Sequence, residues 1–123
     1  MVRDPLAEDD DPDVATVLEA LHDDDCRTIL SKLEEPKTAR GLLERCDIPR
    51  STLYRKLDRL SEATLIREGT EIREDGSHAS RYEIDFEEVI VTRDESIRIE
   101  IERPARGADE RLAEMWSEVR REL

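Results

Sequence analysis

The chain of 123 residues is long enough for one small domain with a modest core. Its formal net charge is -13, 43% of its residues are charged and 3% are aromatic. The longest apolar runs are far shorter than the roughly 18 residues that a membrane span needs, so a membrane protein is excluded and we expect a cytoplasmic one.

Charge is distributed unevenly along the chain. Lys occupies only positions 32, 37 and 56 among the 20 basic residues, against 33 acidic ones. This composition resembles that of proteins from salt-in halophiles such as haloarchaea, and it concerns solubility in concentrated KCl rather than fold. Residues 26–67 nevertheless carry ten basic and six acidic side chains. A basic stretch within an acidic chain indicates a contact with nucleic acid.

The first third of the chain predicts two helices behind an acidic lead-in. Residues 1–11 lack periodicity, and we interpret them as a flexible N-terminus. A helix is predicted from Pro12 to about Leu21, because apolar residues recur there at helical spacing. A second helix is predicted from Cys26 to about Leu33, capped by the polar cluster of residues 22–25 and ended by Pro36.

Two further amphipathic helices follow, joined by a tight turn. Thr38 is a good N-cap for the first of them. The turn is Asp47-Ile48-Pro49, and the next helix runs from Arg50 to about Ala63. This second helix has an apolar face and carries Arg and hydroxyl side chains near its start. That pattern is typical of a helix-turn-helix whose second helix enters the major groove of DNA.

The hydrophobic period then changes from about 3.6 to about 2. Strands are predicted over residues 65–73 and 80–86, with Asp75-Gly76 as the turn of a hairpin between them. A second hairpin is predicted over residues 87–102, where Ile97, Ile99 and Ile101 alternate on one face. We expect this face to be covered, either by extension of the first sheet or across a dimer.

The chain ends in another apolar stripe at helical spacing. Pro104 and Gly107 separate it from the second hairpin, and it contains Trp116, the one Trp of the chain. We interpret residues 108–123 as a C-terminal dimerisation helix, and an ordinary intramolecular core helix is the alternative. The predicted dimerisation residues are Leu112, Met115, Trp116 and Val119.

The run IPRSTLYRKLDRL, from Ile48 to Leu60, and the segment ATLI at residues 63–66 carry a resemblance to a known family. Together they resemble the recognition helix of winged helix-turn-helix transcription regulators of the ArsR, MarR and PadR type, roughly I-S-x-S-T-V-x-x-H-L-x-x-L-x-x-A-G-L-I. Asp47, Pro49 and Thr64 depart from that pattern, which usually has Gly, Ser and Gly there. Thr64 is the costly departure if its φ is positive.

The resemblance covers about half of the chain and implies an α+β fold. Residues 12–86 would form a winged helix-turn-helix DNA-binding domain, and residues 87–123 would add the extra hairpin and the dimerisation helix. It implies a sequence-specific regulator of transcription that binds double-stranded DNA as a homodimer, on a pseudo-palindromic operator. It does not indicate repression or activation. The composition adds the expectation of a high-salt cytoplasm.

Within this interpretation, the DNA-facing residues have separate roles. Arg55, followed by Tyr54, is the expected base reader, because related proteins often place a polar base reader at the position of Arg55. Ser51 and Thr52 would bind phosphate through backbone N–H groups. The predicted DNA-binding set is Thr38, Arg40, Arg50, Ser51, Thr52, Tyr54, Arg55 and Arg59 on the helices, with Arg73, His78 and Arg81 on the first hairpin. Alternatively that hairpin is solvated and touches nothing, since Glu74 and Asp75 repel phosphate.

Other functions remain open in the sequence. A winged-helix module of the transcription machinery would bind protein through the acidic surface and the second hairpin, without sequence-specific DNA binding of its own. The sequence gives no support for an enzyme, a metal site or a cofactor, because catalytic groupings, phosphate loops and metal-ligand spacings are missing from it. Cys46 is expected in the core. Cys26 opens a helix, where the pKa of a thiol is lowered, so a sensor of oxidants remains open. A small-molecule sensor and a regulator controlled only by its abundance remain open as well.

Overall fold

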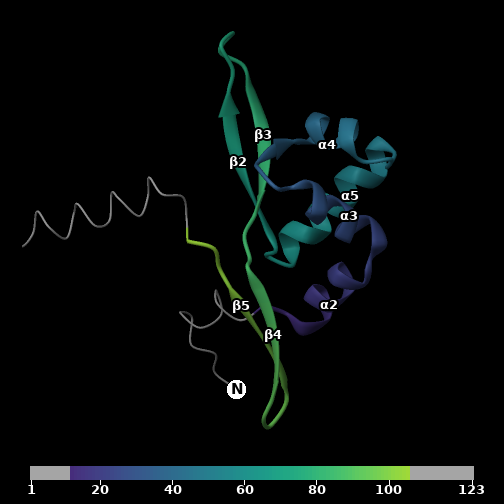
Figure 1. Ribbon diagram of the computed structural model, residues 1–123, viewed down its shortest axis with the longest axis vertical. Helices are drawn as coiled ribbons and strands as arrows, with labels where there is room; N and C mark the ends of the chain where they lie inside the picture. The colour runs from purple at the N-terminus through teal and green to yellow at the C-terminus, as the bar shows by residue number, and fades with distance from the viewer. Residues whose placement is uncertain (1–11, 106–123) are drawn as a thin grey trace, which may run out of the picture.

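The structure is a computed structural model and describes residues 12–105. Figure 1 shows the helices gathered on one side of the molecule and two hairpins that extend toward opposite ends. In chain order the elements are α2 Val14–His22, α3 Asp24–Lys32, β1 Lys37–Thr38, α4 Ala39–Arg45, α5 Arg50–Glu62, β2 Ile66–Ile72, β3 His78–Ile84, β4 Glu88–Arg93 and β5 Ile97–Glu102. Among these residues, no helix has the length and hydropathy to cross a membrane.

Side-chain caps fix where the first helices begin. The Asp13 carboxylate accepts a hydrogen bond from Thr16 N at 3.0 Å, so α2 starts at Val14, two residues later than predicted. Asp23 accepts from Cys26 N at 3.1 Å, so α3 starts two residues earlier than predicted. Thr38 is confirmed as the cap of α4, because its Oγ1 accepts from Gly41 N at 3.1 Å.

The core lies where the four helices meet the base of the first hairpin. Its fully buried side chains come from all four helices and from the segment after α5, and the largest are Val17, Cys26, Ile29, Leu42, Leu53, Leu57, Leu60 and Leu65. Cys46 is also buried, as predicted. The apolar stripe of α5 therefore faces inward, and its polar side chains are left for the surface.

The first hairpin is the wing, defined as β2 and β3 with the turn between them. The two strands pair in register from Ile66 opposite Ile84 to Ile72 opposite His78, and Gly76 adopts a φ of 84° in the turn. The short strand β1 pairs with the other edge of β3, which gives the order β1-β3-β2. We did not predict β1, because two residues are too few to show a period.

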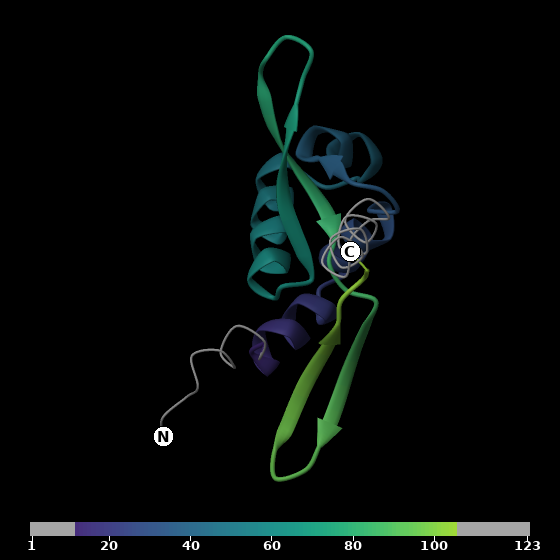
Figure 2. The ribbon, with the colours of Figure 1, turned by 90° about the vertical axis from the view of Figure 1, so that its left-hand side faces the viewer.

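The second hairpin is confirmed but does not extend the wing sheet. Strands β4 and β5 form a sheet of their own, with Val91 opposite Ile99 and Arg93 opposite Ile97. Ile99 is buried and belongs to the core cluster, and β5 contacts α2. Figure 2 shows this hairpin extending away from the wing.

Thr64 is the one non-glycine residue with positive φ in the described part of the chain, at 60°. The guanidinium of Arg103, just after β5, donates to the Thr64 and Asp85 carbonyls, the latter at 2.9 Å, and to Thr64 Oγ1 at 2.9 Å. Arg103 therefore joins the exit of α5, the end of the wing and the end of the second hairpin.

The described residues form a winged helix-turn-helix with an additional β-hairpin. The predicted α+β class is confirmed for this part of the chain. Two predictions lie outside the described residues, namely the flexible N-terminus 1–11 and the C-terminal helix that holds Leu112, Met115, Trp116 and Val119.

Candidate nucleic-acid interface

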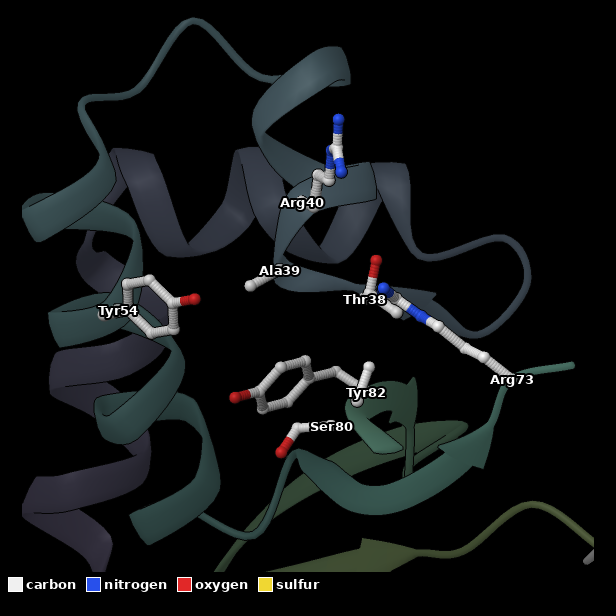
Figure 3. A pocket seen from close by; sticks show the side chains of 8 residues that line it. Thr38, Ala39, Arg40, Tyr54, Arg73, Ser80 and Tyr82 are labelled. Atoms are coloured by element: carbon white, nitrogen blue, oxygen red, sulfur yellow. The ribbon is translucent and has the colours of Figure 1, made fainter. Parts of the chain in front are cut away.

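A cavity of about 250 Å³ lies between α5, the start of α4 and the wing. Figure 3 shows the side chains that line it, with Tyr54 reaching in from α5, Tyr82 from β3 and Arg73 extending toward Thr38. The lining residues are Thr38, Ala39, Arg40, Tyr54, Arg73, Ala79, Ser80 and Tyr82. Four of them, Thr38, Arg40, Tyr54 and Arg73, belong to the predicted DNA-binding set.

Strand β1 brings these residues together. Lys37 pairs with Tyr82 and Thr38 pairs with Arg81, which attaches the start of α4 to the middle of β3. Because Thr38 also caps α4, Ala39 and Arg40 follow at once and lie beside the wing. The helix-turn-helix and the wing thereby share one surface.

Two tyrosines give the cavity phenol groups on different elements. Tyr54 is exposed, whereas Tyr82 is buried. Burial raises the pKa of Tyr82, and the neighbouring Glu68 carboxylate raises it further. Tyr82 therefore keeps its proton at neutral pH, and its phenol is able to donate a hydrogen bond to a phosphate oxygen.

The start of α5 is exposed beside the cavity. Pro49 is its N-cap and makes no side-chain capping bond, so the first N–H groups of the helix have no side-chain acceptor at the cap. Arg50 and Ser51 are exposed and Thr52 is partly buried. Arg55 is also exposed. This end of the helix is suited to an external anion, because unpaired N–H groups and the helix dipole both favour negative charge.

Arg59, a member of the predicted DNA-binding set, already has a partner within the fold. Its Nη1 donates to Asp23 Oδ2 at 3.0 Å, and Lys56 Nζ donates to the same oxygen. Asp23 and Lys56 both have side chains that are 12% exposed. Two basic side chains of α5 are therefore directed toward the start of α3.

Asp23 is a strong acid in this setting. Burial by itself raises its pKa, but the hydrogen bonds from Lys56 and from Cys26 N, with the charge of Lys56, lower it to about 2. Asp23 is thus ionised at all ordinary pH values and holds Lys56 and Arg59 against the helix layer.

The wing residues are not all on the same side. Arg73 lies at the turn and lines the cavity, and Ser80 and Tyr82 line it from β3. Arg81 lies between them in the strand, so it belongs to the opposite face of the wing sheet. His78 is exposed at the first position of β3 and is outside the cavity lining.

Tyr82 is the residue of this site that sequence reasoning missed. Its strand position was predicted, but a Tyr in a half-buried strand is usually a core residue. The alternation of side chains along a strand was the signal that could have found it. Tyr82 lies two residues after Ser80 in β3, so both side chains face the same side of the sheet.

The expectation that the helix start lowers the pKa of Cys26 was wrong. Cys26 is fully buried, and its burial, together with the Asp23 carboxylate, raises its pKa to about 11. Cys46 is buried as well, and its pKa is also raised by burial. Neither thiol has the ionised, accessible form that reacts with oxidants.

Comparisons with known proteins gave one family match and one structural resemblance. Residues 10–69 match a family model described as a helix-turn-helix domain. No curated protein matches the chain. The crystal structure of an ArsR family transcriptional regulator resembles it with a TM-score of 0.47 and 20% sequence identity, over 69% of this chain and 77% of that chain. The family match ends within β2, so the rest of the wing and the second hairpin lie beyond it.

Proposed function

We propose that this protein is a sequence-specific DNA-binding regulator of transcription that acts as a homodimer on a pseudo-palindromic operator. The helix-turn-helix match over residues 10–69 supports DNA binding. The observation that carries the proposal is the shared surface of α5 and the wing, where Arg40, Tyr54 and Arg73 line one cavity beside the exposed start of α5.

Each part of this surface has a task in the proposed complex. The start of α5 enters the major groove, where Arg55 makes a bidentate contact to guanine that contributes about 1–3 kcal/mol of discrimination. The N–H groups near Ser51 and Thr52 bind a phosphate. Arg40 and Arg73 bind the phosphates that run between α5 and the wing, and these contacts orient the protein without reading sequence.

The charge of the chain sets the conditions under which this binding operates. With a net charge of -13, the protein as a whole repels DNA at low ionic strength. Concentrated KCl screens that repulsion but also weakens phosphate contacts, because the counterion-release contribution falls as salt rises. We therefore place the protein in a high-salt cytoplasm, where base contacts supply a larger share of the affinity.

The test is binding of the purified full chain to fragmented genomic DNA in molar KCl, followed by sequencing of the retained fragments. The wild-type protein is expected to enrich one two-fold symmetric motif. Arg55→Ala is expected to lose that enrichment. Arg98→Ala is the matched control, because Arg98 is an exposed arginine of β5 that pairs with Asp94 at 2.8 Å, away from the cavity.

Retention of DNA without a motif would show an architectural DNA binder instead of a specific regulator. A motif that survives Arg55→Ala would assign base reading to another residue. Absence of any retention would contradict the proposal.

A second candidate function is a protein-binding module of the transcription machinery. The observation in its favour is the apolar exposure of the second hairpin, where Val91 and Ile97 are among the exposed large hydrophobic residues. Under this alternative, the same experiment would retain no DNA, and a pull-down with the purified chain would recover a partner protein.

A further inference from the structure

One face of the second hairpin is apolar and only half covered. Val91 lies opposite Ile99, and Ile97 lies two residues before Ile99, so all three side chains are on the same side of the sheet. Ile99 is 3% exposed against the core, whereas Val91 is 56% and Ile97 is 49% exposed. We call Val91 and Ile97 the hairpin face. Leu18, on the helix α2 that β5 contacts, is also exposed.

This face needs a cover for a physical reason. An isolated two-stranded hairpin is marginally stable in water and is stabilised by packing of its apolar side. The core covers Ile99 near the base of the hairpin, but it does not cover Val91 and Ile97 toward the turn. Figure 1 shows the turn of β4 and β5 extending beyond α2.

We propose that the hairpin face binds the C-terminal apolar stripe of a second copy of the chain, and that two such contacts close the dimer. This inference rests on the proposed function only for the requirement of a dimer. The stripe consists of Leu112, Met115, Trp116 and Val119, which lie outside the described residues and are known from sequence alone.

The stripe is complementary to the hairpin face in charge. Arg93 lies opposite Ile97 on the same side of the sheet and makes no ion pair within residues 12–105. The sequence places Asp109, Glu110, Glu114 and Glu118 around the stripe, and these supply carboxylates for Arg93.

The dimer of the proposed function favours a second copy over the same copy. Strand β5 runs from Ile97 near the turn to Glu102 at the base, and Arg103 is then fixed to Thr64 and Asp85. The described chain thus leaves the hairpin at the end opposite to the hairpin face. Reciprocal exchange of identical segments between two copies closes a two-fold dimer at low cost.

The experiment uses Trp116, the one Trp of the chain, as its reporter. In molar KCl, light scattering is expected to give the mass of two chains for the wild type, and Trp emission is expected at short wavelength. Ile97→Asp is expected to give the mass of one chain, with Trp emission shifted to long wavelength. Ile72→Asp is the matched control, because Ile72 is 72% exposed on the wing and is expected to leave mass and emission unchanged.

Mixing two variants tests whether the contact joins two copies. Trp116→Ala has no Trp but keeps an intact hairpin face, whereas Ile97→Asp keeps Trp116 and has a damaged face. When Trp116→Ala is added to Ile97→Asp, the emission of the mixture is expected to shift to short wavelength as mixed dimers form. Addition of a double variant, Trp116→Ala with Ile97→Asp, is expected to cause no shift.

Three outcomes would overturn the inference. They are an Ile97→Asp protein that keeps the mass of two chains, a single-chain wild type with buried Trp116 at every concentration, and a mixture without a shift. DNA retention measured on the same samples separates this inference from the proposed function. If the wild type forms a dimer but retains no DNA, only the proposed function is contradicted. If the protein binds a motif and Ile97→Asp leaves its mass unchanged, only the interface is contradicted.

Discussion

Asp23 decides which basic residues of α5 are available to DNA. It accepts hydrogen bonds from Lys56 and Arg59, and its other oxygen caps α3 through Cys26 N. Arg50 and Arg55, on the same helix, are exposed. Some basic side chains of residues 26–67 therefore hold α5 in place, and others are available to face a partner. A count of charges does not distinguish the two groups.

The first prediction concerns the stability that Asp23 contributes. Its pKa is about 2 in the folded protein against 3.8 ordinarily, so this stability is complete above about pH 4 and is lost as pH falls toward about 2. Asp23→Asn is expected to lower the free energy of unfolding by about 1–2 kcal/mol near pH 6. Urea unfolding at a series of pH values should show the gap between the two proteins closing below about pH 4.

Asp24→Asn provides the control for this measurement, because Asp24 is exposed and its carboxylate pairs with Arg27 of the same helix. Its effect is expected to be small, since an exposed pair contributes little. A gap for Asp23→Asn that stays constant down to about pH 2 would show that the amide, and not the lost charge, causes the destabilisation.

The second prediction concerns the thiols. Because Cys26 and Cys46 are buried and burial raises the pKa of both, neither should react with a thiol reagent near neutral pH while the protein is folded. Both should react at once in denaturant. Rapid labelling of one thiol in the native protein would reopen redox sensing as the inducing signal.

Among the elements, the exit of α5 shows how a departure from a family pattern is accommodated. Thr64 stands where related sequences usually have Gly, and its φ of 60° is a conformation that Gly adopts freely but that is unfavourable for a residue with a Cβ. Its hydroxyl accepts a hydrogen bond from Arg103 at 2.9 Å, which Gly is unable to provide. The hydrogen bond to Arg103, which follows the second hairpin, therefore offsets part of the backbone strain at Thr64.

The third prediction is a double-mutant cycle on this link. Thr64→Gly alone is expected to change the free energy of unfolding by less than about 1 kcal/mol, because relief of strain offsets the lost hydrogen bond. In an Arg103→Ala background, Thr64→Gly is expected to stabilise the protein by about 1 kcal/mol, since only the strain remains. Chemical unfolding of the four proteins measures both values, and simple additivity would show that the link contributes nothing.

The element scale also shows what the sequence was able to predict. Both hairpins and all four helices of the described region have clear periods or caps, such as Thr38 before α4. Strand β1 was not predicted, because two residues show no period. The position of the cavity depends on β1 and was therefore not predicted either. The ion pairs of Asp23 join residues more than thirty positions apart, so local patterns do not predict them.

At the scale of the whole molecule, the candidate DNA surface and the hairpin face lie toward opposite ends. The wing and α5 occupy one end and the turn of β4 and β5 occupies the other (Figures 1 and 2). Substitutions at the two ends should therefore act independently on DNA contact and on assembly.

The fourth prediction is a salt titration of DNA binding. The slope of log K against log salt falls in magnitude by about 0.9 for each phosphate contact that is removed. Arg40→Ala and Arg73→Ala are each expected to reduce it by about that amount. Arg59→Ala should lower thermal stability and leave the slope unchanged, because its guanidinium is already paired with Asp23. A reduced slope for Arg59→Ala would show that Arg59 contacts phosphate as well.

The short connector between the two hairpins limits how this chain can vary in length. Strand β3 ends at Ile84 and β4 begins at Glu88, so three residues separate the wing from the second hairpin. Side chains alternate along a strand, so one inserted residue here would turn Val89, which packs against the core, to the opposite side. The turns at residues 73–77 and 94–96 carry no such restriction. Related chains should therefore differ in length at these two turns and keep the connector constant.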